Sequence, residues 1–115
     1  MLNFGPMNLS DYQEKAATTA LYPNVGNNPY YAALGLAGEA GEVANTVKKI
    51  MRDNDGIVDE AFQKEVQKEL GDVLWYVACV ASEMKLDLNE VAKHNLDKLA
   101  SRKARGVLHG SGNNR

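Results

Sequence analysis

The feature that most constrains this 115-residue chain is the helical spacing of apolar residues on either side of one turn. After Pro29, apolar residues recur at steps of three and four, at positions 33, 36, 40, 43, 47 and 50. A second run with the same period comprises Phe62, Val66, Leu70, Val73, Val77, Val80 and Met84. This spacing puts the apolar side chains on one stripe of an α-helix. Because the turn sequence 53–56 (Asp-Asn-Asp-Gly) separates the runs, we expect a long antiparallel helical hairpin.

Two shorter helices are expected outside this hairpin. The first starts after Ser10 and stops before Pro23, and the last ends at about Ala104, before Gly106. Both starts show capping-box patterns, Ser10 with Gln13 and Asp87 with Glu90. No segment shows strand alternation. We therefore predict an all-α, four-helix bundle-like fold in a single domain over residues 1–115, with a flexible tail at 106–115.

The composition limits the classes of protein to which this chain can belong. Hydrophobic residues make up 44% of the chain and charged residues 24%, which is ordinary for a globular domain. The net charge of -2 argues against a general nucleic-acid or membrane-surface protein. The single cysteine, Cys79, fits a reducing compartment, and no apolar run approaches the length of a membrane span. We expect a cytoplasmic location.

Two segments of the predicted hairpin repeat one acidic pattern. Residues 39–43 read Glu-Ala-Gly-Glu-Val, and residues 69–73 read Glu-Leu-Gly-Asp-Val. Acids three residues apart lie on the same helix face. The midpoint between Gly41 and Gly71 is Gly56, in the predicted turn, so both acid pairs lie equally far from it. The sequence therefore predicts that four carboxylates meet at one level: Glu39, Glu42, Glu69 and Asp72.

Four neighbouring carboxylates repel one another, so their negative charge must be offset. A like pair at about 4 Å costs about 1 kcal/mol in water and about 4 kcal/mol at an effective dielectric constant of 20. A divalent cation, raised pKa values or basic partners would each relieve this repulsion. Oxygen ligands suit Mg²⁺ or Mn²⁺ better than zinc. The alternative is two separate, solvated acid pairs.

The last predicted helix carries the complementary charge. Asn95, Lys98 and Arg102 are spaced by three and four, so they share a face beside the apolar one. Such a stripe can bind phosphate or remain ordinary surface. Tyr76 follows Asp72 by four residues and falls on the acid stripe. Its ring can stack on a nucleobase or be a half-buried helix tyrosine.

At these residues the sequence resembles the MazG-like, all-α nucleoside triphosphate pyrophosphohydrolases. Their signature is ExxE, a spacer and ExxD, which corresponds here to Glu39, Glu42, Glu69 and Asp72 with 26 intervening residues. The resemblance extends over roughly residues 30–105, through G-L-A-G-E-A-G-E-V, K-E-L-G-D-V-L-W-Y and N-L-D-K-L-A-S-R. A basic residue that some members carry four positions before the third acid is replaced here by Glu65.

The resemblance implies an activity and a set of roles. It implies Mg²⁺-dependent hydrolysis, with Mn²⁺ as a substitute, of a nucleoside triphosphate to monophosphate and pyrophosphate, in nucleotide-pool housecleaning. The four acids would bind metal, with Glu39 or Glu42 as general base. Asn95, Lys98 and Arg102 would bind the nucleotide, and the chain would form a homodimer or a dimer-based tetramer. A non-catalytic regulatory module that binds nucleotide or metal is the alternative function.

Overall fold

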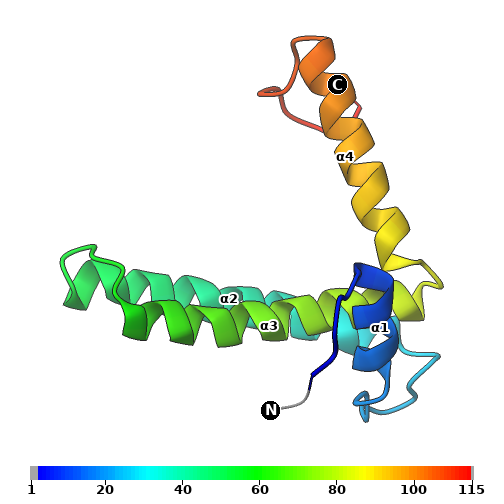
Figure 1. Cartoon of the computed structure of the whole chain (residues 1–115), viewed down its shortest axis with the longest axis horizontal. Coiled ribbons are helices and arrows are strands. Elements are labelled where there is room, and N and C mark those ends of the chain that lie inside the picture. The colour runs from blue at the N-terminus through cyan, green and yellow to red at the C-terminus, as the bar shows by residue number, and fades with distance from the viewer. Residues whose placement is uncertain (1–2, 115) are drawn as a thin grey trace.

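A computed structural model describes residues 3–114, and all regular secondary structure in that range is helical. Its helices are α1 (Leu9–Ala17), α2 (Pro29–Asp53), α3 (Glu60–Glu83) and α4 (Leu88–Ala104). The two long helices lie side by side and antiparallel, α1 packs on the hairpin end where α2 begins and α3 ends, and α4 projects away from the hairpin (Figure 1). The predicted all-α class, the four helices and the central hairpin are confirmed.

Local capping explains where the helices begin. The Asn28 side chain accepts a hydrogen bond from the Tyr31 amide ahead of Pro29, and Asp59 caps α3 in the same way at Phe62. The start predicted for the first helix was wrong. Asn8 is its cap, and it forms a capping box with Asp11.

The first helix ends before Pro23, as predicted: its last residue is Ala17, and hydrogen-bonded turns follow at residues 18–20. Asp87 caps α4 through the Asn89 amide, as expected of a cap, whereas Glu90 pairs with His94 one turn later. The Asp87–Glu90 capping box is therefore not formed. Gly106 follows α4 with φ of 74°, a conformation that favours glycine.

The face of α2 that contacts α3 is rotated from the predicted stripe. Ala33, Ala40 and Val47 of that stripe are exposed. The buried residues of α2 are Ala32, Thr46 and Ile50, of which Ile50 alone belongs to that stripe. Small side chains on this face let α3 approach closely, and larger apolar residues are left outside the hairpin. The buried part of α3 is likewise made of small residues, Ala78, Cys79 and Ala81.

Hydrogen bonds from α1 stabilise the corner between α3 and α4. The Gln13 side chain donates to the Leu86 carbonyl and accepts from the Leu88 amide, both at 2.8 Å. The Ser10 amide donates to the Asn89 side chain, and its hydroxyl donates to Asp87. Ser10 and Gln13, expected to cap their own helix, therefore hold the start of α4 against α1.

Candidate metal and nucleotide site

Two contacts define how α2 and α3 face each other around the acidic motifs. Near the open end of the hairpin, Gly35 lies against the ring of Tyr76. Nearer the turn, the Thr46 hydroxyl donates to a Glu69 carboxylate oxygen at 2.7 Å. In an antiparallel pair, these contacts place α2 residues 35–46 opposite α3 residues 69–76. All four acids lie within these two stretches, at the same level of the hairpin.

The Glu69 side chain is half-buried, and its carboxylate lies against α2. Oε1 accepts from Thr46, whereas Oε2 is buried and has no hydrogen-bond partner in the described structure. A buried carboxylate oxygen without a partner is costly, at about 1–3 kcal/mol or more for a charged group. Buried polar atoms of this kind often indicate a missing water or ion. The acid pair of α3 thus has one oxygen in position for a ligand.

The other three acids are more open. Glu39 is half-buried, and Glu42 and Asp72 are exposed. Among residues 3–114, no three His, Cys, Asp or Glu side chains gather around a point where a metal ion could be held. The four carboxylates therefore share a level on the hairpin while their side chains remain apart.

The glycines that accompany the acids differ in what surrounds them. A Cβ added at Gly41 or Gly71 would meet nothing within 4 Å in this chain. A Cβ added at Gly35 would lie 2.2 Å from the Tyr76 ring. Sequence reasoning singled out Gly41 and Gly71 and missed Gly35. The i,i+4 relation of Gly35 to Glu39 on one helix face was the available signal.

Tyr76 lies at the edge of this level. Its ring packs edge-on against Trp75, with centroids 4.9 Å apart, and contacts α2 at Gly35. Burial raises the pKa of its phenol, and Tyr31 and Glu39 add smaller contributions in the same direction. The ring is therefore packed between the helices, beside Glu39. Its role in substrate binding stays a prediction.

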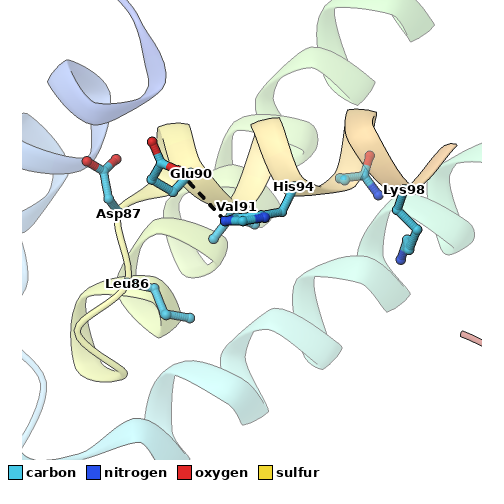
Figure 2. A pocket seen from close by; sticks show the side chains of 7 residues that line it. Leu86, Asp87, Glu90, Val91, His94 and Lys98 are labelled. Atoms are coloured by element: carbon cyan, nitrogen blue, oxygen red, sulfur yellow. Dashed lines mark ion pairs between the residues drawn. The ribbon is translucent and has the colours of Figure 1, made fainter. Parts of the chain in front are cut away.

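The cationic residues of α4 lie apart from the acids of the same chain. Asn95 and Lys98 line an open hollow of about 470 Å³ along α4, together with Leu86, Asp87, Glu90, Val91 and His94 (Figure 2). Since α4 projects away from the hairpin (Figure 1), this hollow does not adjoin the acidic motifs. Within one chain, the structure does not bring the two predicted halves of the site together.

The C-terminal tail turns back onto these cations. Arg102 is only 4% exposed, and its Nη2 donates to the carbonyls of Gly112 and Asn113 at 3.3 and 3.1 Å. The Lys98 ammonium donates to the Asn113 side chain at 3.4 Å. The tail predicted to be flexible thus makes contacts with α4, through the residues expected to bind phosphate.

The family follows from the sequence match, which covers the part of the chain that contains the motifs. The model for the MazG nucleotide pyrophosphohydrolase domain matches residues 29–107. The chain belongs to the MazG family. The MazG match spans α2, α3 and α4, and thus both acidic motifs and the α4 cations.

A phage protein is similar along the whole chain. The Gene 37 protein of Mycobacterium phage L5 is 48% identical over 114 residues, which cover 95% of this chain and 100% of the relative. No solved structure matches this chain. Of the helices in residues 3–114, none has both the length and the hydropathy that crossing a membrane requires.

Proposed function

We propose that this MazG-family protein is a Mg²⁺-dependent hydrolase that converts nucleoside triphosphates to nucleoside monophosphates and pyrophosphate. The observation that carries this proposal is the hairpin level shared by the four acids, with the buried Oε2 of Glu69 lacking a partner. A solvated helix surface would not bury a carboxylate oxygen without a donor. Removal of aberrant nucleotides from the pool is the role we propose in the cell.

The donor set fits Mg²⁺, or Mn²⁺ in its place. It contains oxygen atoms only, as hard divalent cations prefer. Glu39, Glu42, Glu69 and Asp72 would hold the metal, because the exposed Glu42 and Asp72 can change rotamer toward the buried Glu69. When bound, the metal would neutralise charge on the triphosphate and activate water.

The chain's own residues would position substrate and water. Glu39 or Glu42 would accept a proton from the water whose oxygen bonds to the α-phosphorus. The bond between the α- and β-phosphates then breaks, and pyrophosphate leaves. Lys98 and Arg102 would donate to phosphate oxygens, with Asn95 beside them. Tyr76 would border the base or sugar.

A complete site requires more than one copy of this chain. The α4 cations lie away from the acids of their own hairpin (Figure 1). A second copy would bring them to those acids and cover apolar side chains that are exposed on the hairpin, including Val47, Met51 and Leu70. We therefore propose a homodimer, or a tetramer built from dimers, as the active form. A cytoplasmic location stays a prediction.

The direct test is a panel of nucleoside triphosphates assayed with Mg²⁺ for pyrophosphate release. In ¹⁸O-labelled water, the label should enter the monophosphate, because water attacks the α-phosphorus. Glu42→Gln and Asp72→Asn should each lower turnover by orders of magnitude while the protein remains folded. Nucleotide binding without product formation would instead identify the non-catalytic regulatory module.

A further inference from the structure

We propose that Thr46 is a positioning residue for the metal site, because its hydroxyl sets the orientation of the Glu69 carboxylate. This inference rests on the proposed function, in which Glu69 binds Mg²⁺. Thr46 lies outside both acidic motifs and is one of the buried polar residues, at 2% exposure. We infer its role from its contact with Glu69 on α3.

The hydrogen bond of Thr46 crosses between the helices. A threonine inside a helix commonly donates to a carbonyl three or four residues earlier in the same helix. Here Oγ1 of Thr46 on α2 donates instead to Oε1 of Glu69 on α3, at 2.7 Å. The bond therefore joins the two helices at the level of the acids.

Because of this bond, the two carboxylate oxygens of Glu69 have different surroundings. Oε1 is engaged by Thr46, and Oε2 remains buried without a hydrogen-bond partner. The branched Thr46 side chain has few accessible rotamers within a helix, so the donor is stiff. A fixed donor on one oxygen holds the other in place for a cation. Hydrogen bonds to ligating carboxylates commonly have this orienting effect.

The test measures binding of Mn²⁺ alone, without nucleotide, from the paramagnetic resonance signal of free Mn²⁺. Thr46→Val keeps the shape of the side chain and removes the donor, and should weaken Mn²⁺ binding by about tenfold to a hundredfold. Thr46→Ser keeps the donor and should restore binding to within about threefold of wild type. Thr46→Ala replaces the valine variant if that variant does not fold.

The control variant loses a similar hydrogen bond elsewhere. The Thr19 hydroxyl accepts from the Trp75 indole at 2.8 Å, and both residues lie outside the two acidic motifs. Thr19→Val should therefore leave Mn²⁺ affinity unchanged. In a Glu69→Gln background, Thr46→Val should cause little additional loss, because Thr46 acts through Glu69.

The outcomes separate this inference from the proposed function. Wild-type protein that binds no Mn²⁺ would refute the metal site itself. If Thr46→Val binds Mn²⁺ with wild-type affinity, the inference is wrong while the proposed function still stands. The hydroxyl would then only satisfy a buried oxygen. Equal losses in the valine and serine variants would also overturn the inference, because packing rather than the donor would then be responsible.

Discussion

Gly35 shows how a single missing side chain controls the approach of two helices. A Cβ at this position would lie 2.2–2.6 Å from three atoms of the Tyr76 ring. An aromatic ring packed against Trp75 cannot move as freely as the end of a long side chain. The glycine therefore lets α2 and α3 come together one turn from Glu39, at one end of the stretch that carries the acids.

Gly35→Ala should destabilise the protein despite the better helix propensity of alanine. The propensity gain is about 1 kcal/mol, whereas overpacking typically costs about 1–3 kcal/mol or more. We expect a net loss of about 1–2 kcal/mol in the free energy of unfolding, measured by denaturant titration. Gly38→Ala is the matched control, because nothing lies within 4 Å of the added Cβ, and it should be stabilising. Equal destabilisation by both would contradict this account of Gly35.

Glu83 anchors the segment that leads into α2. Its carboxylate accepts from the Tyr22 hydroxyl at 2.5 Å and from the amides of Gly26 and Asn28 at 2.9 and 3.1 Å. The Tyr22 hydrogen bond, followed by that of the Gly26 amide, lowers the pKa of Glu83 below its ordinary value. The charged carboxylate is therefore part of the folded structure.

Because the pKa of Glu83 is lowered in the folded state, the free energy of unfolding depends on pH. Because the folded state favours the ionised form, the contribution of Glu83 is present above the pKa of the unfolded chain and is lost as the pH falls through the folded value. Thermal melts from pH 7 to pH 3 should show Glu83→Gln less stable than wild type near neutrality. That gap should narrow below about pH 4.5. A constant gap for Glu83→Gln over this range would contradict the prediction.

At the scale of elements, the direction of α4 is decided by α1 rather than by the hairpin. Gln13 binds Leu86 and Leu88 at the corner, and Ser10 binds Asn89. Each of these hydrogen bonds joins the first helix to the start of the last. Helix α4, which carries these cations, consequently projects away from the hairpin that carries the acids of the same chain (Figure 1).

Lys98→Ala tests whether the α4 stripe binds the triphosphate. A charge-assisted hydrogen bond is worth about 1.5–3 kcal/mol, so kcat/KM should fall by about tenfold to a hundredfold. Melting should stay near wild type, because the Lys98 side chain is exposed. Lys98 also contacts Asn113, so Asn113→Ala removes that tail contact alone and should keep full kcat/KM. Unchanged kinetics in Lys98→Ala would make the stripe ordinary surface.

At the scale of the whole molecule, a single chain is more open than a compact domain. Its radius of gyration is 16.9 Å, whereas a compact chain of this length has about 13 Å. Its buried apolar residues are mostly small, and bulky ones such as Leu34, Met51 and Leu96 are at least two-thirds exposed. Exposed apolar surface of this extent is typical of chains that associate.

Leu70→Glu tests the association. Leu70 is 51% exposed and lines an apolar hollow of about 390 Å³ with Val47, Ile50, Val58 and Val66. Light scattering should show wild type as a dimer or larger, and the variant should dissociate because a carboxylate would be buried in the interface. Leu21→Glu, in the loop before α2 and 91% exposed, is the control and should remain associated. A monomeric wild type would contradict the proposal.

The helices and the shared level of the acidic motifs could be predicted from the sequence. Helical periodicity and caps at Asn28 and Asp59 are local, and the turn at Gly56 places residues 39–42 and 69–72 at one level. These features depend on residues that are close together in the sequence, so sequence patterns are sufficient to predict them.

Which faces of α2 and α3 meet could not be predicted from the sequence. Apolar residues surround much of α2, so periodicity alone could not show that Gly35 and Thr46 would face α3 while Val47 remained outside. The choice depends on how closely two backbones can approach, and hence on side-chain volume across the hairpin. The direction of α4 likewise depends on Gln13, which is more than 70 residues away from its partners at the corner. Such long-range contacts leave no periodic signal in the sequence.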